Sequence, residues 1–117
     1  MSKTPEGEVK KVIKSYLEMI GCIPASRAVA VSARHCGYYF MPVPNGRGVN
    51  GIPDFIGHYK GRFFAIEAKE DGKNPTALQQ HQLSAIDISG GNAFVVRGLD
   101  DLSEFRDFVR RVGLKLV

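Results

Sequence analysis

The sequence has 117 residues, of which 44% are hydrophobic and 24% charged, and a net charge of +4 at pH 7. This length suits one domain over residues 1–117, and the composition excludes an intrinsically disordered chain. Apolar runs stay far below the roughly 20 residues of a membrane span, no secretory leader is expected, and Cys22 and Cys36 form no CxxC pair, which predicts reduced thiols in the cytoplasm. The excess of Lys and Arg favours an anionic partner such as nucleic acid.

Helical patterns occur in three places along the sequence. The first opens with a typical capping residue, Thr4, continues with apolar residues at helical spacing, and ends at Gly21. The second is expected over residues 76–89, before a pair of glycines. Asp101 and Glu104 form a candidate capping box that opens the third helix.

Strand patterns are clearest in the middle of the chain. Asp54–Tyr59 and Arg62–Lys69 flank the dipeptide Lys60-Gly61, which predicts an antiparallel hairpin. Tyr38–Val43 is rich in aromatic residues and also predicts a strand. Ala28–Val31 is a weaker strand candidate, because proline and polar residues surround it.

The expected order of elements is helix, three strands, helix, strand, helix. The last strand, Ala93–Arg97, follows a helical crossover and is expected to run parallel to the strand before that helix. Residues 45–51 hold three glycines and two asparagines, which predicts a loop that lets backbone approach a ligand. The sequence thus predicts an α/β fold with a mixed sheet flanked by helices.

The second strand of the predicted hairpin is apolar on both faces from Phe63 to Ile66, and charged residues follow only as the strand leaves the core. In an extended strand Glu67 and Lys69 project to the same side, with Cα atoms about 6.6–7 Å apart. The hairpin pairing predicts that Asp54 lies opposite the end of this strand, so the two carboxylates meet. A half-buried charge in such a place is unfavourable unless it is paired, hydrogen-bonded or bound to a metal.

Two converging carboxylates and a backbone carbonyl suit Mg²⁺, which keeps several waters and bridges to phosphate oxygens. With the positive charge of Lys69 beside it, this combination is suited to phosphodiester hydrolysis. The alternative is structural: Pro-Asp is a common turn dipeptide, and Glu-x-Lys is often a surface ion pair. Spacing alone does not decide between the two interpretations.

A series of short motifs runs through nearly the whole chain in a fixed order. It consists of Thr4-Pro5-Glu6-Gly7, Phe40-Met41-Pro42-Val43, Asn45-Gly46, segments 51–57 and 60–69, Pro75-Thr76 with Gln79, and Gly90-Gly91 before Phe94-Val95-Val96. This series resembles the PD-(D/E)xK nuclease superfamily and, within it, the virus-type replication-repair nuclease (VRR-NUC) family. The resemblance implies a restriction-endonuclease-like core and a DNA endonuclease that depends on Mg²⁺ or Mn²⁺.

The resemblance also implies roles for individual residues. Asp54 and Glu67 would hold the ion together with the Ala68 carbonyl, Lys69 would assist the nucleophile, and Gln79 would support the site. For Gln79 a structural role is equally concrete, because a Thr-x-x-Gln sequence is a capping box.

An acidic residue on the first helix would complete the metal site. The family pattern favours Glu6 over Glu8. Both glutamates also complement the positive end of the helix dipole, so a purely structural role stays open for each.

Several residues are candidates for contacts with the DNA backbone: Asn45, Arg47, Arg62 and Lys73, with Arg34 and Arg97 as further candidates. Arg47 comes first among them, because its loop leads into Asp54. The sequence has no recognition-helix or zinc-finger signature, which favours recognition of DNA shape over bases.

Cutting both strands of a substrate needs two catalytic centres, which predicts a homodimer. The resemblance makes four-way DNA junctions the leading substrate, and its viral members imply a phage protein in the host cytoplasm. The alternatives are a flap or general DNA nuclease and a catalytically silent DNA-binding module of the same fold.

Overall fold

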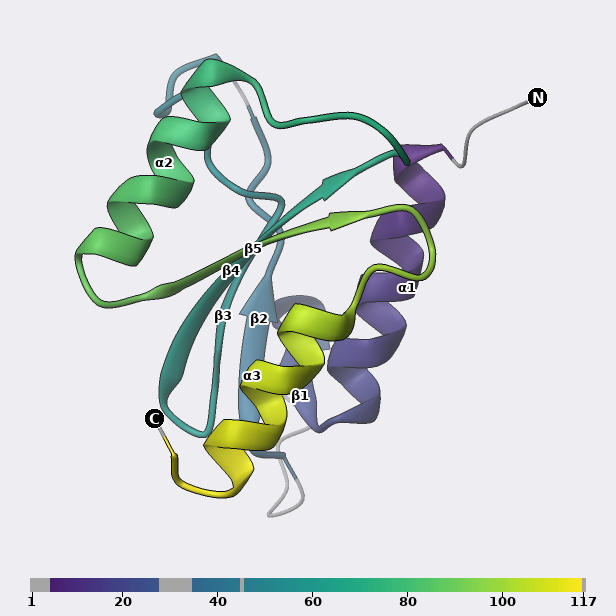
Figure 1. Cartoon of the computed structure of the whole chain (residues 1–117), viewed down its shortest axis with the longest axis vertical. Helices are drawn as coiled ribbons and strands as arrows, with labels where there is room; N and C mark the ends of the chain where they lie inside the picture. Colours follow the sequence, from purple (N-terminus) through teal and green to yellow (C-terminus); the bar gives the residue numbers. More distant parts are fainter. Residues whose placement is uncertain (1–4, 28–34, 45, 117) are drawn as a thin grey trace.

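The computed structural model describes residues 5–27, 35–44 and 46–116. Its elements follow in the order α1 (Glu6–Met19), β1 (Cys22–Pro24), a short 3-10 helix η1 (Ala25–Arg27), β2 (Gly37–Phe40), β3 (Phe55–Tyr59), β4 (Arg62–Lys69), α2 (Ala77–Ile88), β5 (Asn92–Arg97) and α3 (Ser103–Gly113) (Figure 1). The predicted cap Thr4, the strand candidate 28–31, Arg34 and Asn45 lie outside the described residues.

The strands form a mixed sheet of five in the order β1-β2-β3-β4-β5. The predicted hairpin is confirmed: β3 and β4 are antiparallel, and both turn residues, Lys60 and Gly61, have positive φ, as a two-residue hairpin turn requires. The predicted crossover is also confirmed, because β5 follows α2 in the sequence and pairs in parallel with β4. The α/β prediction with a mixed, helix-flanked sheet is therefore correct.

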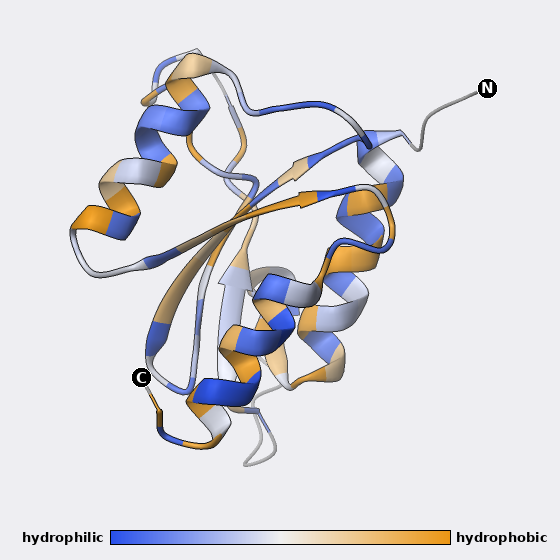
Figure 2. Ribbon diagram, viewed as in Figure 1, coloured by the Kyte–Doolittle hydropathy of each residue, from blue (hydrophilic) through white to orange (hydrophobic). Residues whose placement is uncertain are grey.

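Helices cover the two faces of the sheet unequally. Helices α1 and α3 lie on one face, and α2 lies on the other, beside β4 and β5 (Figure 1). Phe105 of α3 makes ring contacts with Tyr16, Phe64 and Phe94, so the aromatic core lies between α1, α3 and the sheet. Hydrophobic and hydrophilic stretches alternate along α1 and α3, as expected of helices with one buried side (Figure 2).

The predicted order of elements is wrong in one respect, because strand β1 precedes the predicted three. It pairs in parallel with β2, Cys22 opposite Gly37. A Cβ at Gly37 would lie 2.6 Å from Cys22 Sγ, so the close approach depends on glycine there. Three residues ending in proline carry too little periodicity to be recognised in a sequence. Cys22 and Cys36 are free thiols, as predicted.

Two boundaries also differ from the prediction. Strand β2 ends at Phe40 and not at Val43, since prolines at positions 42 and 44 have no N–H for a sheet. The predicted capping box of Asp101 is wrong: α3 has Leu102 as its N-cap, because Asp101 Oδ2 accepts a hydrogen bond from the Arg97 backbone N–H at 3.0 Å. Within the described residues, no helix has the length and apolar character to cross a membrane.

Candidate functional site

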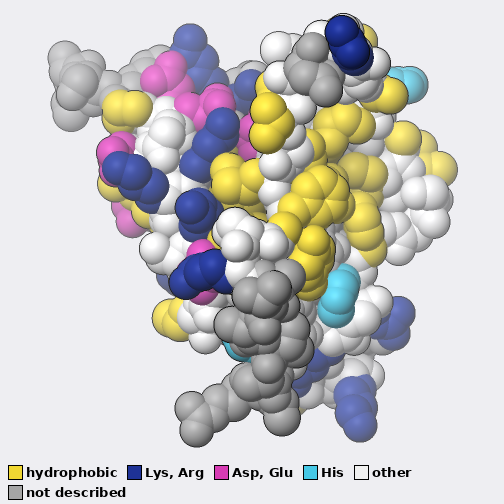
Figure 3. Space-filling view, turned by 180° about the vertical axis from the view of Figure 1, so that it is seen from behind, with side chains coloured by type: hydrophobic (Ala, Val, Ile, Leu, Met, Phe, Trp, Pro, Cys, Tyr) yellow, Lys and Arg dark blue, Asp and Glu magenta, His cyan; other side chains and the backbone are white. Residues whose placement is uncertain are grey.

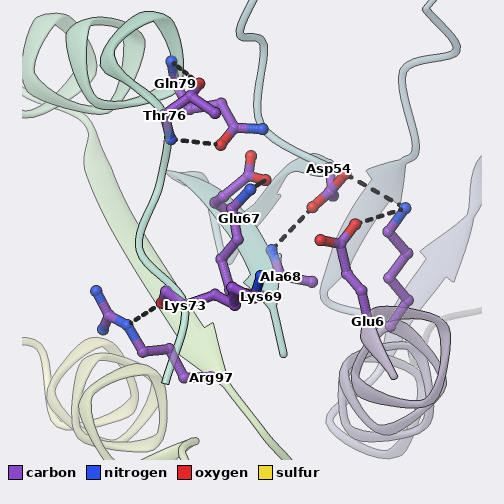
Figure 4. A network of polar contacts seen from close by, with 10 residues as sticks. Glu6, Asp54, Glu67, Ala68, Lys69, Lys73, Thr76, Gln79 and Arg97 are labelled. Atoms are coloured by element: carbon purple, nitrogen blue, oxygen red, sulfur yellow. Dashed lines mark hydrogen bonds and ion pairs between the residues drawn. The ribbon is translucent and has the colours of Figure 1, made fainter. Parts of the chain in front are cut away.

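The open end of the β3–β4 hairpin brings the predicted carboxylates together. Phe55 pairs with Ile66, and continuing this register by one residue places Asp54 opposite Glu67. The Glu67 side chain lies on the face of the sheet that α2 partly covers, because Phe64, Ile66 and Ala68 enter the core on the other face. Figure 4 shows Asp54, Glu67 and Lys69 gathered at this end of the sheet.

Asp54 is fixed from two sides. Its Oδ2 accepts a hydrogen bond from the Ala68 backbone N–H at 2.8 Å, and its Oδ1 lies 3.5 Å from Lys10 Nζ. The first contact ties the residue before β3 to the end of β4. The second ties it to α1.

Glu67 is the one buried charged residue of the described chain, with 1% of its surface exposed. Its Oε2 lies 3.8 Å from Lys69 Nζ, and its Oε1 is buried without a hydrogen-bond partner among the described residues. Burial, and next the adjacent Asp54 carboxylate, raise the pKa of Glu67 from 4.5 to about 8, against a smaller opposing effect of Lys69. An orphaned, strongly perturbed carboxylate of this kind is typical of a functional site.

Lys10 is a site residue that the sequence interpretation missed. The helical pattern placed it on the exposed side of α1, but its Nζ lies 3.6 Å from Glu6 Oε2 and 3.5 Å from Asp54 Oδ1. The available signal was the spacing of four residues between Glu6 and Lys10, which puts them on one side of a helix. That spacing does not reveal that a third charge comes from another element.

The two candidate carboxylates of α1 face different surroundings. Glu6 shares Lys10 with Asp54, and its charge contributes to the raised pKa of Glu67. Glu8 is exposed and pairs with Lys11 at 3.3 Å. Of the two, Glu6 therefore lies toward the site.

Gln79 forms the predicted capping box with Thr76. Its Oε1 accepts from the Thr76 backbone N–H at 2.9 Å, and Thr76 Oγ1 accepts from the Gln79 backbone N–H at 3.2 Å. The same residue borders a pocket of about 360 Å³ that also reaches Asp54. The capping bond uses only the oxygen of its side-chain amide, so the amide nitrogen is not needed for the cap.

The loop before Asp54 lines the pocket and packs tightly on α2. It is lined by residues of segments 42–44, 46 and 48–52 together with Asp54 and Gln79. At Gly51, φ is +84°, and a Cβ would lie 2.5 Å from the Leu78 carbonyl oxygen. Glycine at this position thus lets the loop approach the first turn of α2.

The candidate DNA contacts are not all near the carboxylates. Arg47 is exposed in the loop that lines the pocket, and Lys73 is exposed after β4, 3.5 Å from Glu70. Arg62 begins β4, roughly 16 Å along the strand from Glu67. The structure therefore brings Arg47 and Lys73, and not Arg62, toward the site end of the sheet.

Arg97 has a structural role. Its Nε donates to the Lys73 carbonyl oxygen at 2.8 Å (Figure 4). Its guanidinium also donates to Asn74 Oδ1 at 3.0 Å. These bonds hold the segment between β4 and α2 against β5. That segment carries Lys73 and leads to Gln79.

The residues present fit a cation that takes only part of its shell from protein. Within residues 5–27, 35–44 and 46–116, no three or more His, Cys, Asp or Glu side chains are grouped as metal ligands. Mg²⁺ is usually held by one or two carboxylates, with waters and substrate phosphates filling its shell. The Asp54 carboxylate and the orphaned Glu67 Oε1 match that requirement.

Comparison with known proteins adds no relative. No family model, curated protein or solved structure matches the chain.

Proposed function

We propose that the chain is a DNA endonuclease that depends on Mg²⁺ or Mn²⁺ and has a restriction-endonuclease-like core of the VRR-NUC type. The observation that carries this proposal is the buried Glu67, whose Oε1 has no partner among the described residues, opposite Asp54 and beside Lys69. Burying a carboxylate in this way is costly unless a ligand compensates for it. A divalent cation is the ligand that two adjacent carboxylates favour.

In this proposal Asp54, Glu67 and the Ala68 carbonyl hold the ion. A bound Mg²⁺ or Mn²⁺ lowers the pKa of water and stabilises negative charge on a phosphate. The Ala68 N–H orients Asp54 by its hydrogen bond to Oδ2. Burial of Glu67 excludes bulk water and so strengthens its interaction with a cation.

Lys69 is the residue proposed to assist the nucleophile. Its side chain is 12% exposed and its ammonium lies 3.8 Å from Glu67 Oε2, so it is held at the edge of the site. From there it orients the attacking water and offsets charge that develops on the phosphate. Gln79 has an amide nitrogen available at the rim of the pocket for a further contact with the substrate.

The proposed substrate is branched DNA, with four-way junctions first and flaps or plain duplexes as alternatives. Arg47 and Lys73 are exposed on loops at the site end of the sheet, and lysine or arginine at such places binds phosphates without reading bases. The chain has a net charge of +4, which also favours a polyanion.

The proposed homodimer is supported by a part of the sheet that none of the described helices covers. The outer face of β2, β3 and β4 carries an apolar cluster that Figure 3 shows in the middle of the surface. We name it the apolar face; its positions, from the strand register and burial, are Tyr38, Phe40, Ile56, His58 and Phe63. None is Lys, Arg, Asp or Glu, so this face suits a second copy of a positively charged chain better than DNA.

The deciding experiment is a cleavage assay. Purified protein is incubated with four-way, flap and linear duplex DNAs, in Mg²⁺ and in Mn²⁺, beside the variants Asp54→Asn and Lys69→Ala. Both variants are expected to lose cleavage by at least about a hundredfold, while Glu8→Gln, whose carboxylate faces Lys11, keeps it. DNA binding without cleavage would favour the silent binding module, and cleavage by Asp54→Asn would exclude this site.

A further inference from the structure

Lys10 places a positive charge beside Asp54. Its ammonium lies between two carboxylates from different elements, 3.6 Å from Glu6 Oε2 on α1 and 3.5 Å from Asp54 Oδ1 before β3. About a third of its side chain is exposed. Solvent exposure leaves it a path to swing out without disturbing the core.

The position of Lys10 matters because of the other charges around the site. Three carboxylates, those of Glu6, Asp54 and Glu67, lie near two ammonium groups, those of Lys10 and Lys69. Lys69 forms an ion pair with Glu67. The Ala68 N–H occupies Asp54 Oδ2, so Lys10 is the counter-ion of the other oxygen, Asp54 Oδ1. A divalent cation held by Asp54 and Glu67 would repel an ammonium at this short range.

We propose that Lys10 is an exchangeable counter-ion: it leaves Asp54 when a divalent cation binds and then contacts a phosphate of the DNA. This inference rests on the proposed nuclease function and deepens it, because it makes metal binding and DNA binding depend on each other. Before the cation binds, Lys10 is engaged with Glu6 and Asp54 and contributes little to DNA affinity. Afterwards it adds one phosphate contact beside the reacting strand.

The first test measures Mn²⁺ affinity by electron paramagnetic resonance on the wild-type protein, Lys10→Met and Lys11→Met. Lys11 is the matched control, because it lies on the same helix, is 74% exposed and pairs with Glu8. Lys10→Met is expected to bind Mn²⁺ about tenfold more tightly, since a competing charge is removed, and Lys11→Met within twofold of the wild type. Unchanged or weaker Mn²⁺ binding by Lys10→Met would overturn the proposal.

The second test measures affinity for a short DNA duplex in EDTA and in Ca²⁺, with gels to confirm that the DNA stays intact. In Ca²⁺, Lys10→Met is expected to bind DNA several-fold more weakly than wild type, with a salt slope smaller by about one. In EDTA the two proteins are expected to bind equally. The same loss in EDTA and in Ca²⁺ would mean that Lys10 contacts DNA independently of the metal, which contradicts the exchange.

Two further outcomes separate this inference from the proposed function. If the wild-type protein binds no Mn²⁺, both are wrong. If the wild type binds Mn²⁺ and cleaves DNA while Lys10→Met behaves as wild type, only the role of Lys10 is refuted. Lys10→Gln repeats every measurement with a polar neutral side chain, and thermal unfolding of each variant shows whether the fold is kept.

Discussion

The Ala68 backbone N–H donates a hydrogen bond to Asp54 Oδ2 at 2.8 Å, so the carboxylate just before β3 is anchored to the end of β4. One oxygen of Asp54 thereby serves the fold, while the other faces Lys10. Because the two oxygens of Asp54 have different partners, a substitution can remove the charge of the side chain and keep its hydrogen bond to the Ala68 N–H. The amide of asparagine keeps an oxygen for the Ala68 N–H but removes the charge.

Asp54→Asn is therefore expected to fold normally but to lose DNA cleavage and Mn²⁺ binding. Its free energy of unfolding should stay within about 1 kcal/mol of the wild type, whereas Asp54→Ala, which leaves the Ala68 N–H unpaired, should lose about 1–3 kcal/mol. Both should lose cleavage and Mn²⁺ binding. Urea unfolding and Mn²⁺ titration measure the two effects separately, and normal metal binding by Asp54→Asn would remove Asp54 from the site.

Glu67 makes the stability of the metal-free protein depend on pH. Its pKa is about 8 in the folded chain and near 4.5 when unfolded, so between these values the folded state holds one more proton. The free energy of unfolding should then fall as pH rises from about 5 to 8, by roughly a few kcal/mol, and level off above. Thermal unfolding in EDTA across this range measures the slope.

Glu67→Gln is the matched control for that slope. Glutamine is neutral throughout, so the variant should show no decrease due to position 67 and should exceed the wild type in stability at pH 9. Mg²⁺ should reverse the order at pH 9, because it stabilises only the protein that can bind it. A wild-type slope that persists in Glu67→Gln would assign the effect to other groups.

A substitution at Gly57 tests the pairing of β2 with β3 in the sheet that carries the site. A Cβ there would lie 2.1 Å from the Tyr38 carbonyl oxygen and 2.9 Å from Tyr39 Cα, both of them backbone atoms of β2. Gly57→Ala should therefore cost about 3 kcal/mol or more of the free energy of unfolding. Gly7→Ala is the control, because a Cβ in that turn of α1 meets nothing within 4 Å, and alanine should stabilise the helix by roughly 0.5–1 kcal/mol. Equal stability of the two variants would contradict the β2–β3 register.

Much of the site could be predicted because hairpin geometry is local. The Lys60-Gly61 turn fixes the register of β3 and β4, and this register alone brings Asp54 and Glu67 together. The capping box of Thr76 and Gln79 is likewise contained in four consecutive residues. Such features follow from spacing along one or two neighbouring elements.

Features that depend on distant elements could not be predicted in the same way. Lys10 has the sequence environment of an exposed helix residue, and only the packing of α1 beside the hairpin places it at Asp54. Asp101 matches a helix cap in sequence, but its carboxylate accepts a hydrogen bond from the backbone N–H of Arg97 at the end of β5. Strand β1 depends on pairing with β2 across the segment 28–34, which lies outside the described residues.

The apolar face tests the proposed homodimer. Phe40 is 41% exposed there, so Phe40→Asp adds a charge without removing core contacts and is expected to convert a dimer into a folded monomer. Met19→Asp is the control, since Met19 is exposed at the end of α1, on the other side of the sheet. Sedimentation equilibrium measures the masses: a monomeric wild type, or a dimeric Phe40→Asp, would refute this interface. A four-way junction gives a second readout, because the monomer should nick single strands but lose paired cuts on opposite strands.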